Sequence, residues 1–174
     1  MALIIEDGTG KADAEAYADA AAYTAWHTAY YGAAPTEATA VIEGGIRRAV
    51  SYLQTLSWNG SRTNGRSQAL AWPRSDVTDC EGNAIADDEI PAELIQSQHI
   101  LTRAELASPG ILAPSGSAIG GIKREKVDVI EVEYDTSRGS GTVDDLRVYV
   151  MGALDLLKCF AATPGGRKPW AVAV

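Results

Sequence analysis

Apolar positions recur at helical spacing in four parts of the chain, and long polar connections separate these parts. The first stretch, Ala12–Tyr31, is alanine-rich, and its aromatic residues fall near i, i+3, i+4 spacing. We expect a helix here that begins near Asp13 and ends at Gly32. The second pattern, opened by Pro35 and Thr36, is the clearest. Its apolar stripe is formed by Ala38, Val41, Ile42, Ile46, Ala49, Val50 and Leu53.

The connection between these two helices is only Gly-Ala-Ala-Pro, which favours an antiparallel pair. Gly44 and Gly45 lie inside the second stripe, where each glycine disfavours the helix by about 1 kcal/mol, so we expect a closely packed neighbour there. A third helix should begin at Pro91, after three acids, and a fourth should follow Thr142. Their expected buried sides are Leu94, Ile95, Leu101 and Ala104 in the third, and Leu146, Val150, Ala153, Leu154 and Leu157 in the fourth.

The period changes to alternation within Ile122–Tyr134, which predicts strands. Because the parity shifts near Asp128, we expect a hairpin that pairs Lys123–Val127 with Ile130–Tyr134. The sequence thus predicts a mainly α fold, with a four-helix bundle-like core, a small β-hairpin, a long irregular loop over Ser57–Ile90 and an extended C-terminal tail. We expect a domain of residues 1–160, with the hairpin at about 122–135, and a tail of residues 161–174.

Charge divides sharply around the long loop. Val41–Arg74 holds five arginines and one acid, whereas Ser75–His99 holds seven acids and no Lys or Arg. A molecule with such opposed faces can dock on its own copy in a head-to-tail ring. Alternatively, Tyr52, Trp58 and Trp72 interleave with those arginines as in a platform for single-stranded nucleic acid. Against this alternative, Tyr52 also fits a core position and the neighbouring acids compete for the arginines.

Composition narrows the class of protein. A chain of 174 residues with 46% apolar and 22% charged residues fits one globular domain. It has no apolar run long enough for a membrane span and no signal peptide at its start, so we expect a cytoplasmic protein. The net charge of −8 weighs against a dedicated nucleic-acid binder. Cys80 and Cys159 form no obvious framework, and in a reducing cytosol we do not expect a disulfide.

The residues offer little catalytic chemistry. His27 and His99 are expected to be packing or surface residues, and with the cysteines they lack the spacing of a zinc site. The run Gly8–Lys11 lacks the earlier Gly and the Ser/Thr of a phosphate loop, so it is interpreted as a turn. The acids around Gly82 do not fit an EF-hand, because Ala and Ile occupy its Gly and Glu places. We therefore expect no enzyme, cofactor or metal.

Three segments carry a resemblance to a family of small tailed-bacteriophage proteins. They are EDGTG-x-ADAEAY (Glu6–Tyr17), QALAWPRSDVTDCEGNAI (Gln68–Ile85) with DEIP (Asp88–Pro91), and IKREKVDVIEVEY (Ile122–Tyr134). Members of this family are often labelled DnaT-like single-stranded-DNA-binding proteins. The family also resembles the head-tail connector, or adaptor, proteins of siphophages and gene transfer agents. AWPRS with DEIP is the most specific part, and the C-terminal region matches less clearly.

The connector resemblance implies a structural protein of the virion neck, assembled in the host cytoplasm. It implies a ring, commonly a dodecamer, that surrounds the DNA passage and joins the portal protein to a tail-side connector or stopper protein. An acidic ring would hold passing DNA without sticking to it, so we favour this function, with single-stranded-DNA binding as the alternative. Expected subunit contacts are Arg62, Arg66, Trp72, Arg74, Asp87, Asp88 and Glu89. Expected portal contacts in the tail are Arg167, Lys168 and Trp170.

Overall fold

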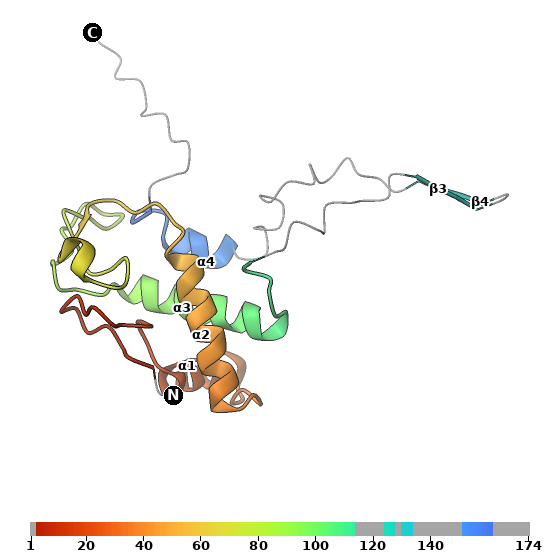
Figure 1. The fold of residues 1–174 in the computed structure, drawn as a ribbon, viewed down its shortest axis with the longest axis horizontal. Coiled ribbons are helices and arrows are strands. Elements are labelled where there is room, and N and C mark those ends of the chain that lie inside the picture. The colour runs from red at the N-terminus through yellow and green to blue at the C-terminus, as the bar shows by residue number, and fades with distance from the viewer. Residues whose placement is uncertain (1–2, 114–123, 128–129, 134–150, 162–174) are drawn as a thin grey trace, which may run out of the picture.

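The computed structural model describes residues 3–113, 124–127, 130–133 and 151–161, and Figure 1 shows their arrangement. The elements are α1 (Ala20–Tyr31), α2 (Thr39–Leu53), β1 (Ser61–Arg62), a 3-10 turn η1 (Gly65–Ser67), β2 (Arg74–Ser75), α3 (Ala92–Ala107), β3 (Arg124–Val127), β4 (Ile130–Glu133) and α4 (Met151–Leu156). The mainly α fold with a small hairpin is therefore confirmed. Along the described ranges, no helix has the length and apolarity to cross a bilayer.

The core lies between α2, α3 and α4. Helix α2 buries Ile42, Ile46, Ala49, Val50 and Leu53, as the stripe predicted, but Val41 is 51% exposed. The main partner of α2 is α3, and its contact with α1 is smaller. The predicted close neighbour is present at Gly45, because a Cβ there would lie 3.0 Å from Leu106 Cδ2 of α3. The glycine thus lets two helix backbones approach each other.

Helix α1 begins later than the alanine-rich pattern predicts. Its N-cap is Asp19, whose side chain accepts a hydrogen bond from Ala22 N, and not Asp13. The backbone before it bends at Tyr17 and Ala18 and is held there by Gln98 of α3, which accepts from Tyr17 N at 2.8 Å and donates to Ala18 O at 2.9 Å. These bonds span about eighty positions of sequence. A tertiary contact therefore overrides the local helix propensity.

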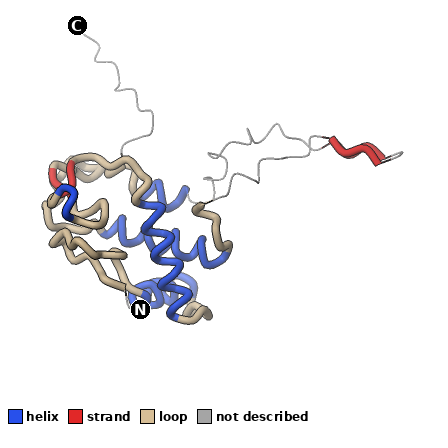
Figure 2. Tube along the Cα trace, viewed as in Figure 1, coloured by secondary structure: helices blue, strands red, loops and turns tan. Residues whose placement is uncertain are grey.

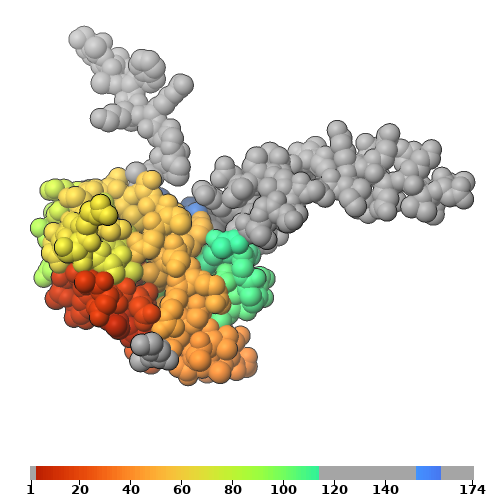
Figure 3. All heavy atoms as spheres, in the orientation of Figure 1, coloured from red at the N-terminus to blue at the C-terminus, as the bar shows by residue number. Residues whose placement is uncertain are grey.

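The long loop between α2 and α3 forms an ordered side of the molecule, opposite the helices (Figure 2). Strands β1 and β2 pair antiparallel, with Arg62 opposite Arg74. The N-terminal residues lie beside this loop (Figure 3), and Ala69 N donates to Lys11 O at 2.9 Å. Trp72 is fully buried, with the rings of Trp58 and Phe160 each 5.9 Å away and edge-on. The loop supplies part of the core instead of merely covering it.

The turn at Gly8–Lys11 is built around the carboxylate of Glu6, which is only 2% exposed. Glu6 accepts hydrogen bonds from the backbone N–H groups of Gly8, Gly10 and Lys11, at 3.0, 2.8 and 2.8 Å. Gly8 and Gly10 both have positive φ, as glycine readily does. The amides that could cradle a phosphate are thus occupied by an anion of the same chain.

The hairpin register is confirmed, with Val127 opposite Ile130 and Arg124 opposite Glu133. The described part of α4 and the turn after it bury Ala153, Leu157 and Phe160, and Ser97 donates to Ala153 O at 2.9 Å. The first expected turns of the fourth helix, from Thr142, lie outside the described residues. So do the tail and with it Arg167, Lys168 and Trp170.

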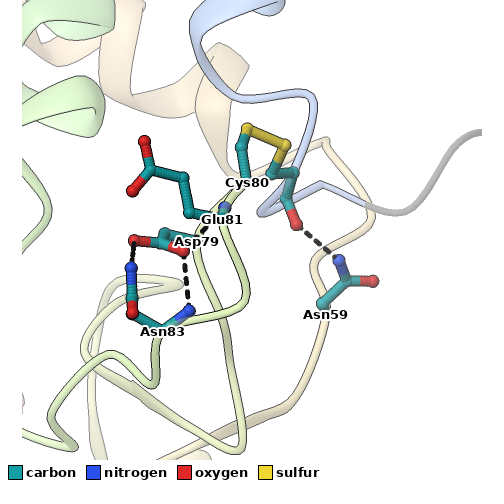
Figure 4. Close-up of a disulfide and its surroundings, with 6 residues drawn as sticks. Asn59, Asp79, Cys80, Glu81 and Asn83 are labelled. Carbon is teal, nitrogen blue, oxygen red and sulfur yellow. Dashed lines mark hydrogen bonds between the residues drawn. A yellow bond between two sulfur atoms is a disulfide. The ribbon is translucent and has the colours of Figure 1, made fainter.

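The two cysteines form a disulfide, contrary to the expectation from sequence. Cys80 lies in the loop at Asp79–Asn83 and Cys159 in the turn after α4, with their Cα atoms 5.2 Å apart (Figure 4). Asn59 holds the same turn by donating to Cys159 O at 2.9 Å, and Asn59 N donates to Phe160 O at 2.9 Å. The fold thus brings together residues 79 positions apart, which sequence spacing does not reveal.

Candidate functional site

Most arginines of the basic region have partners inside the molecule. Arg74 is buried and donates to three carbonyl oxygens, those of Asn59 at 2.6 Å, Gly60 at 2.7 Å and Ala71 at 3.1 Å. Because burial removes water from its guanidinium, the pKa of Arg74 is lowered. Arg47 forms a bidentate pair with Glu15, at 3.0 and 3.1 Å. These side chains organise the fold and are not presented to a ligand.

The residues predicted for subunit contact therefore separate into two groups. Trp72 and Arg74 are buried within the subunit, so the structure corrects the expectation that their side chains reach a partner. Arg62 is half-buried, and Arg66, Asp87, Asp88 and Glu89 are exposed. Because Trp72 and Arg74 are internal, the predicted single-strand platform lacks its central ring and one of its cations. Whether the exposed residues contact another subunit stays a prediction.

The carboxylate of the acidic turn at Asp79–Asn83 is likewise occupied by hydrogen bonds within the turn. The carboxylate of Asp79 accepts from Asn83 Nδ2 at 2.9 Å and from the backbone N–H groups of Glu81 and Asn83, at 2.8 Å each (Figure 4). The side-chain hydrogen bond from Asn83 is the main reason why the pKa of Asp79 is lowered. Among the described residues, no three His, Cys, Asp or Glu side chains gather as metal ligands do.

A cavity of about 230 Å³ lies between α2, α3 and the turn after α3. Its polar side carries Arg48 and Glu105, whose Nε and Oε1 atoms are 2.7 Å apart. Glu105 is 1% exposed and also accepts from Gly110 N at 2.7 Å and Leu112 N at 3.3 Å. The pair is neutral overall, so the cavity offers no unbalanced charge to an ionic ligand.

An exposed group of aromatic rings lies at the C-terminal end of α1. We call it the aromatic face and define it as Trp26, His27, Tyr30 and Tyr31 of α1 with Arg103 of α3. Tyr30 is 61% and Tyr31 47% exposed. Their i, i+4 neighbours pack against them with tilted rings, with ring centroids 5.1 Å apart for Trp26 and Tyr30 and 4.9 Å for His27 and Tyr31.

Local backbone structure and buried rings hold this face in place. Gly32 ends α1 in the left-handed region, with φ 75°, and its N–H donates to Thr28 O. His27 Nδ1 donates to Ala33 O at 2.8 Å, which fixes the ring orientation. Beneath the face, Tyr23 and His99 are buried, and the His99 ring lies 5.4 Å from Trp26. The exposed rings therefore rest on a packed base.

Buried and exposed members of this cluster differ in their electrostatics. Burial is the main reason why the pKa of His99 falls to about 4, so this ring is neutral at neutral pH. Burial also raises the pKa of Tyr23 to about 12, with Glu37 nearby as a smaller contribution. Arg103 is exposed, and its Cζ atom lies 4.2 Å from the Tyr31 ring centroid, a cation-π contact. The aromatic face thus joins stacked rings to one exposed positive charge.

Sequence patterns do not reveal this face. The aromatic residues of the first helix fall at helical spacing, and no motif places Arg103 in a site. The available signal was the i, i+4 spacing of Trp26 with Tyr30 and of His27 with Tyr31 near a helix end. Spacing alone does not say which side of a helix the rest of the chain covers.

One protein family matches almost the whole chain. Residues 1–171 match the family described as "Putative DnaT-like ssDNA binding protein". The chain belongs to this family. No curated protein and no solved structure matches the chain. The family description agrees with the single-stranded-DNA label named in the resemblance, and it says nothing of a head-tail connector.

Proposed function

We propose that this protein binds single-stranded DNA, without a catalytic step, on the aromatic face. The description of its family supports this ligand. The observation that carries the proposal is the exposure of Tyr30 and Tyr31, with Arg103 over the Tyr31 ring. Unpaired bases stack on exposed aromatic rings, and each such contact contributes about 1–3 kcal/mol. A duplex keeps its bases stacked on one another, so the aromatic face prefers single strands.

Stacking must contribute more than phosphate binding in this protein. The net charge of −8 repels the nucleic-acid backbone at long range. Several cations are already paired, with Lys11 2.9 Å from Asp7, Arg47 3.0 Å from Glu15 and Arg48 2.7 Å from Glu105. We therefore expect modest affinity, with dissociation constants of about 1–100 µM at physiological salt, the range of non-specific binding.

Fluorescence anisotropy tests the proposal directly. The probe is a labelled oligodeoxythymidylate of about 12 nucleotides, within the usual site sizes of single-strand binders. Its single strand should bind in the micromolar range, and a duplex of equal length should bind more weakly. Tyr30→Ala should weaken binding, whereas Tyr30→Phe, which keeps the ring, should not. Absence of any single-strand binding at about 100 µM, the weak end of that range, refutes the function.

A second candidate function is the head-tail connector. The observation in its favour is that charges of opposite sign remain exposed, Arg66 on η1 and Asp87, Asp88 and Glu89 before α3. In this alternative the chain forms a ring, commonly a dodecamer, in the virion neck. The portal protein and a tail-side connector or stopper would be its partners, and an acidic wall would let DNA pass without retaining it.

Electron microscopy of the purified protein with and without portal protein tests the connector function. Since single exposed ion pairs contribute only about 0–1 kcal/mol, ring formation needs several pairs acting together. Arg66→Glu should then weaken ring assembly, and adding Asp88→Lys should partly restore it. A chain that lacks residues 162–174 should assemble but fail to attach to portals. Assembly unchanged by Arg66→Glu would mean that the exposed charges are only a solvated surface.

A further inference from the structure

The two exposed tyrosines of the aromatic face have different surroundings. Tyr30 is the more exposed, and the ring contact described for it is with Trp26 at 5.1 Å. Its hydroxyl meets Gln96 Nε2 at 3.4 Å, a long contact at the rim of the ring. Its environment leaves ring surface open to a planar ligand. Tyr30 is therefore the side chain of this face best placed to stack on a base.

Tyr31 is already in contact with several groups. His27 lies 4.9 Å from its ring centroid, Trp26 approaches edge-on at 5.8 Å, and the guanidinium of Arg103 lies over the ring at 4.2 Å. A base could stack on Tyr31 at the Arg103 side only by displacing the arginine. Tyr31 therefore acts as a support that fixes the position of Arg103.

Arg103 has the properties of a phosphate ligand. It is exposed, and within the described ranges no carboxylate lies within 4.0 Å of its guanidinium nitrogens. A guanidinium over an aromatic ring can still donate its N–H groups outward, and these groups match the oxygens of a phosphate. The α1 sequence itself contains no charged residue. Arg103 is thus the cation that this face presents, and it lies over Tyr31, the neighbour of Tyr30 in sequence.

We propose that Tyr30 stacks on one base while Arg103, positioned by Tyr31, contacts a single phosphate of the same strand. This inference rests on the single-stranded-DNA-binding function proposed above. It makes the recognition unit about one or two nucleotides, read without sequence preference, because every base has a π face. It also fixes the salt dependence, since each phosphate contact contributes a slope of about −0.7 to log K against log salt concentration.

The test is a salt titration of oligodeoxythymidylate binding by the full chain and matched variants. The wild-type slope should be about −0.7, the value for one phosphate, and Arg103→Gln should bring it close to zero. Arg66→Gln, which removes an equally exposed charge outside the aromatic face, should leave the slope unchanged. Tyr30→Ala should lower affinity roughly 5-fold to 100-fold with the slope unchanged, the effect of one stacked base.

Tyr31 is tested by a pair of variants. Tyr31→Ala should weaken binding about as much as Arg103→Gln, and Tyr31→Phe should restore wild-type affinity, because the ring and not the hydroxyl supports the arginine. Circular dichroism of each variant checks that α1 is intact.

Several results would overturn this division of roles. Binding with a slope of about −2 or steeper that Arg103→Gln leaves unchanged would place several phosphate contacts elsewhere and leave the DNA-binding function standing. Wild-type affinity in Tyr30→Ala would remove the base from this face and would leave single-stranded-DNA binding standing only at another site. No binding by the wild-type chain would overturn the function and this inference together.

Discussion

The disulfide between Cys80 and Cys159 gives a prediction whose size follows from the structure. The bond closes a loop over 79 positions of sequence. In the chain-entropy description, a loop of this length stabilises the folded state by about 4.5 kcal/mol at 25 °C. For a chain of this size, 1 kcal/mol corresponds to roughly 2–4 °C in melting temperature, so reduction should lower Tm by about 9–18 °C. Asn59 and Phe160 should keep the turn after α4 docked in the reduced protein.

Thermal unfolding followed by far-UV circular dichroism, with and without a phosphine reductant, measures this effect. The double variant Cys80→Ser/Cys159→Ser is the control, because it should unfold at the Tm of the reduced wild type and ignore the reductant. Thiol titration of the denatured, non-reduced protein should find no free thiol, since both cysteines are bonded. Two free thiols, or equal Tm values with and without reductant, would refute the reasoning.

Three further changes probe the fold. Trp72→Ala should destabilise by about 3–5 kcal/mol in urea unfolding, the usual loss for a buried Trp, and no measurable loss would contradict its place in the core. Gly8→Ala should destabilise the fold by more than about 1 kcal/mol, because its Cβ would collide with Asp88 O. Gly82→Ala is the control, because Gly82 has a similar φ but open space around it, so this variant measures the cost of the backbone conformation alone. His99 has a folded pKa of about 4 against about 6.5 unfolded, so the unfolded state binds more protons between these values and stability should fall by up to roughly 3 kcal/mol as pH drops from 6.5 to 4. The urea midpoint should change less with pH in His99→Leu than in the wild type across that range. An equal pH dependence in both proteins would contradict the assignment.

Local patterns predicted the elements whose residues interact mainly with sequence neighbours. The start of α3 just after Pro91 and the pairing of Val127 with Ile130 follow from capping and alternation within a few residues. The stripe of α2 was found because one side of that helix is buried from Ile42 to Leu53 and α3 is its main partner. In these places, propensity and tertiary packing agree, so the sequence is sufficient.

The errors occurred where distant residues decide the local structure. Gln98 holds the backbone of Tyr17 and Ala18 in a non-helical bend, so the alanine-rich stretch forms a helix only after Asp19. The Cys80–Cys159 bond depends on where the turn after α4 meets the long loop. The aromatic face was missed for the same reason, because exposure of Tyr30 depends on which parts of the chain cover α1. The Gln98 bonds and the disulfide leave no periodic signal in the sequence, and the i, i+4 spacing of the rings does not report their exposure.

The location of the arginines bears on both candidate functions. The division of charge along the sequence assumes that charged side chains face solvent, but Arg47 pairs with Glu15 and Arg74 is bonded to backbone carbonyls. If all five arginines bound phosphates, the slope of log K against log salt concentration would be about −3.5. We do not expect so steep a slope, because some of these arginines are paired inside the molecule. Arg48 is exposed but paired with Glu105, so the same pairings leave the exposed Arg66 to face the acids of a second subunit. Arg103 alone suits weak single-strand binding on the aromatic face better than it suits a ring held together by charge. The salt dependence of DNA binding and the ring assembly of the Arg66 variants therefore separate the two functions.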